Sequence, residues 1–207
     1  MAIRDLGQLN AMHLDVLREI GNIGAGNAAT ALAQMLNREI GVTTPSVRIL
    51  DIAEAGEALG GPETPAAAIL VELYGQISGV MMFVVNKSTA EALLERLLGK
   101  SRVDCLHLSE MERSAFSELG NIMVGSYTRA IASLSGLKIK MTVPAVTCDM
   151  VGSLLTVPAA EMGADSDKII FIEDDFINPN RAVSANMMLI PRLESLDKLM
   201  DSLGISL

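Results

Sequence analysis

Small and apolar side chains recur at helical spacing over residues 10–36. The members of this face are Leu14, Leu17, Gly21, Gly24, Ala28, Ala31 and Met35. A repeat of three or four residues predicts a helix. The glycines at positions 21, 24 and 26 each cost a helix about 1 kcal/mol relative to alanine. We therefore expect them to permit close approach of another backbone, within the fold or from a partner.

Residues 40–54 alternate loosely between apolar and polar and contain Pro45. This pattern predicts a strand near a sheet edge, because proline cannot donate to the ladder of hydrogen bonds. The Gly/Pro/Glu-rich residues 56–65 predict a loop.

Two apolar runs follow, over residues 68–74 and 79–85, with turn residues between them. They predict an antiparallel hairpin. A short helix is expected over residues 89–98, from an N-cap at Ser88 to a stop at Gly99.

The same order of elements then returns. Ser109 and Glu112 are candidates for a capping box that opens a helix to about residue 134, and a strand is expected over residues 139–146. The second half ends with predicted strands over 168–173 and 184–190, a polar turn at 178–180, and a helix over 196–203 that Gly204 stops. At an offset of 99 the identical pairs include Glu19/Glu118, Gly21/Gly120, Asn22/Asn121, Ile23/Ile122, Gly26/Gly125, Ala31/Ala130, Ala33/Ala132, Ile40/Ile139, Thr43/Thr142, Pro45/Pro144 and Val47/Val146.

These patterns predict an α+β fold built from a duplicated helix–strand–hairpin–helix unit. The repeats cover about 10–99 and 109–204 of a single domain, 1–207. One repeat has too little surface to close a core alone, so the two should pack around a pseudo-twofold axis. We expect a mainly antiparallel sheet flanked by helices.

Composition narrows the classes of function. The net charge of −9 argues against nucleic-acid binding, which needs a basic surface. No apolar run is long enough for a membrane span, and the charged N-terminus does not read as a signal peptide. The sequence therefore predicts a cytoplasmic protein without membrane insertion.

The residue types that bind metals or form cross-links are few. Cys105 and Cys148 lack CxxC spacing, so we expect buried reduced thiols, with a disulfide or a metal site as alternatives. The two histidines, His13 and His107, have no ligand partner at helical spacing, and no metal site is predicted. The acidic run at 173–175 is interpreted as a solvated edge rather than a cation site. The 13 methionines are interpreted as core filling rather than an adaptable binding surface.

One polar pattern occurs in both halves. An acid or hydroxyl residue is followed after four positions by Glu, three later by Asn and four later by Gly, which places all four on one helix face. We call Asp15, Glu19, Asn22 and Gly26 the first stripe, and Ser114, Glu118, Asn121 and Gly125 the second stripe.

A plain solvated face is the simpler interpretation of each stripe. Two observations favour function: Asn is a poor helix former, and the Glu–Asn pair is kept in both copies while Arg18 has become Ser117. A Glu–Asn pair lacks a nucleophile and its base. A carboxamide can, however, hold a water in line with a phosphoryl group when the phosphate and Mg²⁺ come from elsewhere.

The doubled pattern, with the run Glu-Ile-Gly-Asn-Ile-Gly-Ala-Gly-Asn at 19–27, resembles the CheC–CheX–FliY phosphatases of chemotaxis over nearly the whole chain. Because it has two intact motifs, the chain resembles the free-standing members of this family most. The resemblance implies hydrolysis of the aspartyl phosphate of the response regulator CheY. It implies that Asn22 and Asn121 orient water and that Glu19 and Glu118 engage a regulator lysine.

The resemblance further implies that the remaining stripe residues, Asp15, Ser114, Gly26 and Gly125, contact the partner. It implies no cofactor beyond the Mg²⁺ that the regulator carries, and it makes the receptor deamidase CheD a second partner. One alternative stays open: a non-catalytic adaptor that binds phosphorylated CheY or CheD. Nucleotide binding by the glycine-rich run is disfavoured, because the glycines have the wrong order and lie within a helix pattern.

Overall fold

The computed structural model describes residues 3, 5–162, 168–178 and 181–205. Two 26-residue helices dominate it: α1 (Ala11–Leu36) and α4 (Glu110–Ser135). The first half contains η1 (Leu6–Gln8), β1 (Gly41–Val42), β2 (Ser46–Asp51), α2 (Ile52–Ala58), β3 (Pro65–Gly75), β4 (Gly79–Asn86) and α3 (Lys87–Leu98). The second contains η2 (Cys105–His107), β5 (Ile139–Met141), β6 (Ala145–Met150), α5 (Val151–Leu154), α6 (Thr156–Met162), β7 (Lys168–Asn178), β8 (Arg181–Pro191) and α7 (Leu193–Ser202).

The caps show why the long helices begin where they do. The Asn10 side chain accepts hydrogen bonds from the backbone N–H groups of Met12 and His13, at 3.0 and 3.2 Å. Ser109 and Glu112 form the capping box expected for α4. α3 begins two residues earlier than predicted, because Asn86 and not Ser88 caps it, accepting from the Thr89 N–H at 2.8 Å.

The strands form one antiparallel sheet that the two halves share. Its order is β1-β7-β8-β4-β3-β5, with β2 also paired to β7 and β6 also paired to β3. Each central hairpin therefore carries the edge strands of the other half: β2 pairs with β7, and β6 pairs with β3. The expected α+β fold with a pseudo-twofold, duplicated arrangement is confirmed.

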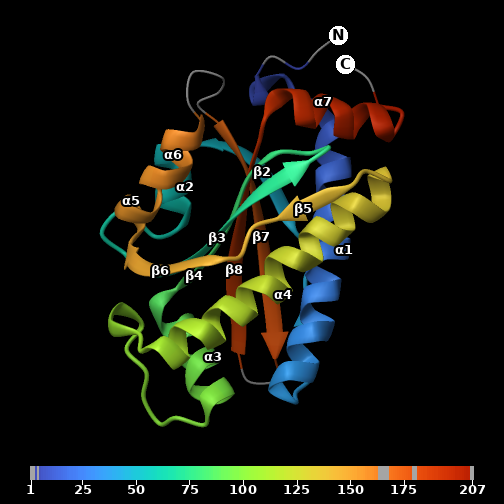
Figure 1. Ribbon diagram of the computed structural model, residues 1–207. Helices are drawn as coiled ribbons and strands as arrows, with labels where there is room; N and C mark the ends of the chain where they lie inside the picture. The colour runs from blue at the N-terminus through green and yellow to red at the C-terminus, as the bar shows by residue number, and fades with distance from the viewer. Residues whose placement is uncertain (1–2, 4, 163–167, 179–180, 206–207) are drawn as a thin grey trace.

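Helices cover both faces of this sheet. α1 and α4 lie side by side on one face and run in roughly opposite directions, whereas α2, α5 and α6 gather on the other side (Figure 1). One apolar core fills the space beneath α1, α3 and α4, and a second, smaller core lies beneath α2 and α5. The paired methionines of β4 and β8 (Met81, Met82, Met187 and Met188) are buried, as expected for core residues.

Several segments differ from the prediction. The strand expected over 40–54 is broken at Pro45 into β1 and β2, and a helix, α2, replaces its end because Asp51 and Glu54 form a capping box. The loop expected over 56–65 therefore begins inside a helix. Helices α5 and α6 were not predicted. Of the turn expected at 178–180, residues 179 and 180 lie outside the described residues.

Candidate functional site

The two Glu–Asn pairs lie on the surfaces of the two long helices. Glu19, Asn22 and Glu118 are exposed and Asn121 is half-buried, so neither amide is sealed in the core. The Asn22 Nδ2 donates to Glu19 Oε2 at 3.5 Å, and the Asn121 Nδ2 donates to Glu118 Oε2 at 3.3 Å. The same weak contact in both helices orients each carboxamide along its helix. Because the amide nitrogen faces the carboxylate, the carbonyl oxygen is available to accept from water.

The first residues of the two stripes have different surroundings. Asp15 accepts from Arg18 Nη1 at 2.5 Å, an exposed pair at i,i+3 spacing that contributes little stability. Ser114 in α4 is exposed and stands opposite no such arginine, since Ser117 replaces Arg18. Both residues are thus accessible to a partner, with a carboxylate at one site and a hydroxyl at the other.

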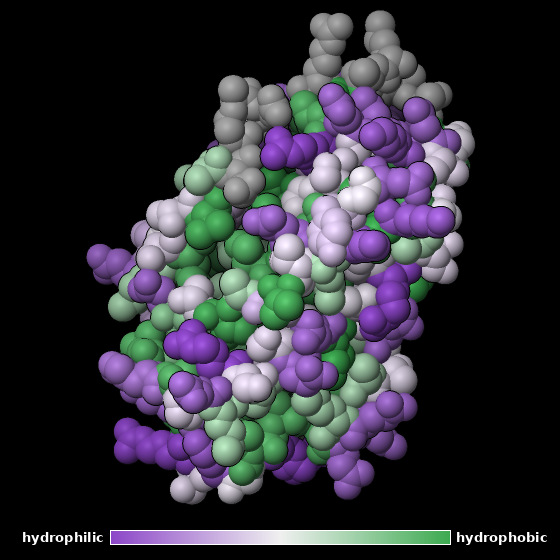
Figure 2. All heavy atoms as spheres, viewed as in Figure 1, coloured by the Kyte–Doolittle hydropathy of each residue, from purple (hydrophilic) through white to green (hydrophobic). Residues whose placement is uncertain are grey.

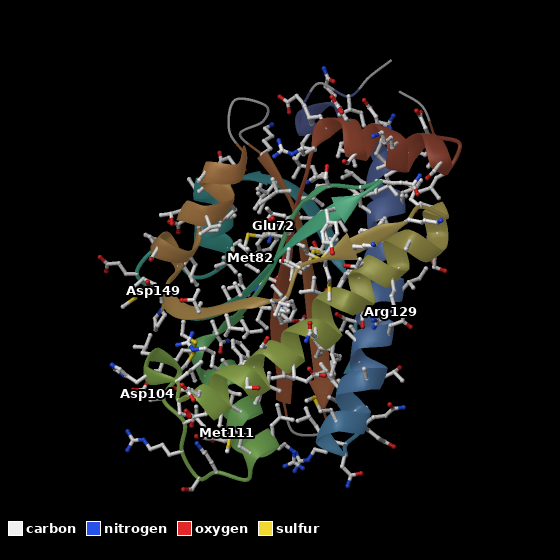
Figure 3. The ribbon with its side chains drawn as sticks, in the orientation of Figure 1. Glu72, Met82, Asp104, Met111, Arg129 and Asp149 are labelled. Carbon is white, nitrogen blue, oxygen red and sulfur yellow. A yellow bond between two sulfur atoms is a disulfide. The ribbon has the colours of Figure 1, made fainter. Side chains whose placement is uncertain are left out.

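The last residues of the stripes also differ. Apart from the neighbouring residues and backbone of its own helix, nothing lies within 4 Å of the position that a Cβ on Gly26 would occupy, so the surface beside Asn22 is open. The corresponding position on Gly125 is 3.0 Å from Arg129 Nη1, and the Arg129 Nη2 donates to Ser126 Oγ at 3.1 Å. Arg129 lies on α4 (Figure 3) and brings a positive charge near the second stripe.

The other glycines of α1 and α4 have a packing role, but against side chains and not against a second backbone as we expected. A Cβ on Gly24 would lie 2.5 Å from the Tyr127 ring, and one on Gly21 would lie 3.0 Å from Pro45 Cγ. A Cβ on Gly120 would collide with Ile69 and lie 3.4 Å from Pro144 Cβ. The glycine before each asparagine therefore lets its helix pack closely against the proline that links two edge strands and against an isoleucine of a central strand, Ile172 or Ile69.

Sequence reasoning missed this role of Pro45 and Pro144. Each proline lies in the link between two edge strands, directly beneath the glycine that precedes Asn22 or Asn121. The signal was present, because both prolines belong to the pairs that match at the 99-residue offset. Pro45 was interpreted only as a sign of a strand edge, and Pro144 only as one of the matching pairs.

The expectation of reduced thiols is wrong: Cys105 and Cys148 form a disulfide, with their Cα atoms 5.9 Å apart. The bond joins η2, which precedes α4, to β6, which lies beside β3. The two cysteines are 43 residues apart, so only the folded chain brings them together.

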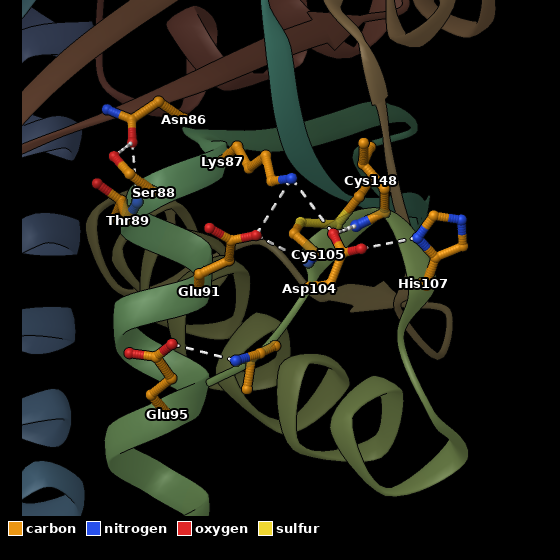
Figure 4. A network of polar contacts seen from close by, with 12 residues as sticks. Asn86, Lys87, Ser88, Thr89, Glu91, Glu95, Asp104, Cys105, His107 and Cys148 are labelled. Atoms are coloured by element: carbon orange, nitrogen blue, oxygen red, sulfur yellow. Dashed lines mark hydrogen bonds and ion pairs between the residues drawn. A yellow bond between two sulfur atoms is a disulfide. The ribbon is translucent and has the colours of Figure 1, made fainter. Parts of the chain in front are cut away.

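Ion pairs hold the same corner of the molecule (Figure 4). Lys87 Nζ lies 3.2 Å from Asp104 Oδ1 and 3.4 Å from Glu91 Oε1, while His107 Nδ1 lies 2.8 Å from Asp104 Oδ2. The contacts with His107, the Leu106 N–H and Lys87 lower the pKa of Asp104 to about 2. Near the start of α4, Lys100 Nζ donates to Glu112 Oε1 at 2.7 Å. The start of the helix that carries the second stripe is thereby fixed.

One residue of the acidic run is buried, contrary to the interpretation of a solvated edge. Asp174 is fully buried and accepts a hydrogen bond from the Tyr127 hydroxyl group, next to Gly24 of α1. Burial raises the pKa of Asp174 to about 6, although the Tyr127 hydrogen bond opposes the shift. Burial beside this carboxylate also raises the pKa of Tyr127 well above its ordinary value.

Within the described residues, no group of three or more His, Cys, Asp or Glu side chains is arranged to hold a metal ion. None of the helices in this part of the chain is long and apolar enough to cross a membrane. Polar side chains cover much of α4 and α7 in the space-filling view, and apolar surface shows between α6 and α4 (Figure 2).

Comparisons with known proteins identify the family to which the chain belongs. A sequence model of the CheC-like family matches residues 12–49 and 111–147, which contain both stripes. CheY-P phosphatase CheC of Bacillus subtilis is 35% identical over 198 residues, which cover 94% of this chain and 95% of that protein. The flagellar motor switch phosphatase FliY of Bacillus subtilis is 33% identical over 70% of this chain, and the match spans only 38% of FliY.

Solved structures share the fold. FliY of Thermotoga maritima has a TM-score of 0.75 at 22% identity, covering 95% of this chain and 98% of that one. The CheX–CheY–BeF₃–Mg²⁺ complex of Borrelia burgdorferi gives a TM-score of 0.54 at 18% identity, covering 84% and 99%. With two motif segments matched and 35% identity to CheC along nearly its full length, the chain belongs to the CheC-like family.

Proposed function

We propose that this protein hydrolyses the aspartyl phosphate of a CheY-type response regulator at two equivalent sites. The observation that carries the proposal is the Glu–Asn pair at the surface, present with the same internal contact on α1, where both residues are exposed, and on α4, where Asn121 is half-buried. Relatives support it, since those named CheC and FliY are named as phosphatases. The structural neighbour CheX was solved with CheY, beryllofluoride and Mg²⁺.

In the proposed mechanism the regulator supplies the phosphoryl group and its Mg²⁺, and this protein supplies position. The side-chain oxygen of Asn22 or Asn121 accepts a hydrogen bond from a water and holds it in line with phosphorus. The water oxygen forms the new bond as the bond from phosphorus to the aspartyl oxygen breaks, so phosphate leaves and the carboxylate returns. No metal of its own is required for this step.

Glu19 and Glu118 are assigned a second task, which is to pair with a lysine at the active site of the regulator. Each carboxylate lies one helical turn before its asparagine and is exposed, so a cation delivered by a partner can reach it. Asp15 and Ser114 lie one turn earlier and would contact the same partner. Gly26 leaves open surface beside Asn22 for an incoming loop, whereas Gly125 is buried against Arg129, whose side chain the loop would meet at the second site.

Measuring phosphate loss from phosphorylated CheY, with and without the protein, tests the proposal. We expect faster loss with the native protein and the uncatalysed rate with the double variant Asn22→Ala/Asn121→Ala. If the native protein binds the regulator without accelerating phosphate loss, the adaptor function replaces the phosphatase. Binding to CheD and a cytoplasmic location belong to the same proposal, and a pull-down with purified CheD tests the first of them.

A further inference from the structure

The exposed positions of α1 and α4 can be compared as two copies of one surface. Eight residues of α1 are exposed: Ala11, Met12, Asp15, Glu19, Asn22, Asn27, Thr30 and Gln34. At the 99-residue offset their counterparts in α4 are Glu110, Met111, Ser114, Glu118, Asn121, Ser126, Arg129 and Ser133. Only three of the eight are identical. Two are the Glu–Asn pair, and the third is a methionine, Met12 or Met111.

The fold does not account for these two methionines. Their side chains are 60% and 65% exposed, unlike the buried methionines of β4 and β8. Neither belongs to the buried residues of the apolar core or to the half-buried residues that pack against it. Neither caps its helix, because Asn10 and Ser109 perform that task. A single exposed apolar side chain is ordinary on a protein surface, and six other large apolar residues are exposed in the described part of this chain. The recurrence of the same residue at equivalent places near both Glu–Asn pairs is what points to a contact outside this chain.

Helix geometry puts each methionine on nearly the same line as the glutamate of its Glu–Asn pair. Met12 precedes Glu19 by seven residues, and Met111 precedes Glu118 by seven. Seven residues are about 10 Å along an α-helix and about 20° from a full number of turns. Met111 lies at the start of α4, as Figure 3 shows. A domain that contacts the carboxylate also reaches the methionine within one interface of ordinary size.

We propose that Met12 and Met111 are apolar anchors that bind the response regulator beside each Glu–Asn pair. This inference rests on the proposed function and adds a source of affinity to it. An exposed ion pair between a glutamate and a regulator lysine contributes little binding free energy in water. Burying a methionine side chain contributes through the hydrophobic effect, and its flexible thioether adapts to an irregular surface. The Glu–Asn pair then positions the reaction, and the methionine holds the partner.

The test measures each site alone and determines KM and kcat separately. Met12→Gln is placed in the Asn121→Ala background, where only the first site acts, and Met111→Gln in the Asn22→Ala background. Glutamine keeps the length and the helix propensity of methionine. We expect KM for the phosphorylated regulator to rise about tenfold with kcat unchanged. Val157→Gln, at an exposed position of α6, is the matched control and should change neither constant.

Binding is measured separately by titrating the regulator, loaded with beryllofluoride and Mg²⁺, into the Met12→Gln/Met111→Gln double variant. We expect its Kd to rise about tenfold relative to the Val157→Gln control. An unchanged Kd, or a KM equal to that of the corresponding single-site protein without the methionine substitution, would overturn the proposal that the methionines are anchors. If the parent single-site proteins show no phosphate release while Kd still rises, the phosphatase proposal fails and the anchor stands.

Discussion

The two halves of the molecule carry the same Glu–Asn pair in different surroundings. On α1 the Glu–Asn pair is flanked by the Asp15–Arg18 ion pair and by the open surface at Gly26. On α4 it is flanked by Ser114 and by Gly125 beneath Arg129. The contact between glutamate and asparagine is nevertheless the same within 0.2 Å, at 3.5 and 3.3 Å. What the duplication has kept is the geometry of the pair.

The interiors of the halves differ more than their surfaces. At the 99-residue offset, Leu6 and Ile49 stand where Cys105 and Cys148 form the disulfide. In the sheet, Ala68 of β3 pairs with Thr147, and Phe171 of β7 pairs with Arg48, which is the counterpart of Thr147 at the 99-residue offset. Residues of β3 therefore correspond to residues of β7 at an offset of 103. By that relation Val71 is the counterpart of Asp174. The second half thus uses covalent and polar contacts where the first uses apolar packing.

The largest expected effect of this difference is on stability, through the disulfide. Replacing both cysteines by serine removes a link that closes a 43-residue separation. Loop-closure entropy then predicts a loss of about 4 kcal/mol in the free energy of unfolding. Denaturant unfolding measures it, with Leu6→Ala as the comparison in the first half. An unfolding midpoint unchanged by the double substitution would show that the disulfide does not stabilise the second half.

Asp174 should make stability depend on pH. Its folded pKa, about 6, lies above the ordinary value of 3.8, so the folded state binds the proton more tightly than the unfolded chain. The contribution to stability is therefore complete below about pH 4 and is lost as pH rises through about 6, by up to about 3 kcal/mol. Unfolding measured from pH 4 to 7 should show this fall, and Asp174→Asn should flatten it. A stability that rises over this range in the native protein and not in the variant contradicts the assignment.

Glycine substitutions in α1 should have opposite effects two positions apart. Gly24→Ala places a Cβ against the Tyr127 ring and should cost about 2 kcal/mol. Gly26→Ala meets no atom and should stabilise the helix by about 0.5–1 kcal/mol, while reducing phosphate release at the first site because the space beside Asn22 is filled. Thermal unfolding and the phosphatase assay are measured on both variants. Equal destabilisation by the two would remove the distinction between a packing glycine and a site glycine.

Local patterns predicted most of the elements and both stripes. α1 and α4, the hairpins and the repeat follow from periodicity, caps and the 99-residue offset, and they place the Glu–Asn pairs on exposed helix faces. What failed depends on contacts between distant segments. The disulfide, the burial of Asp174 and the exchange of edge strands between halves are fixed only when the sheet assembles.

Short helices were the other source of error. α2, α5 and α6 have four to seven residues, too few for periodicity to distinguish them from loops or strand ends. The capping box of Asp51 and Glu54 was the available signal for α2. In α5 the N-cap side chain makes no hydrogen bond, so the sequence there offers no comparable mark.

The equivalence of the two Glu–Asn pairs is tested most directly by the rate of phosphate release from phosphorylated CheY with each asparagine replaced in turn. Asn22→Ala and Asn121→Ala should each remove the share of one site, the two shares should add up to the native rate above background, and the double variant should show the uncatalysed rate. Full loss in either single variant, or activity that survives in the double variant, would contradict two independent sites that hold water by a carboxamide.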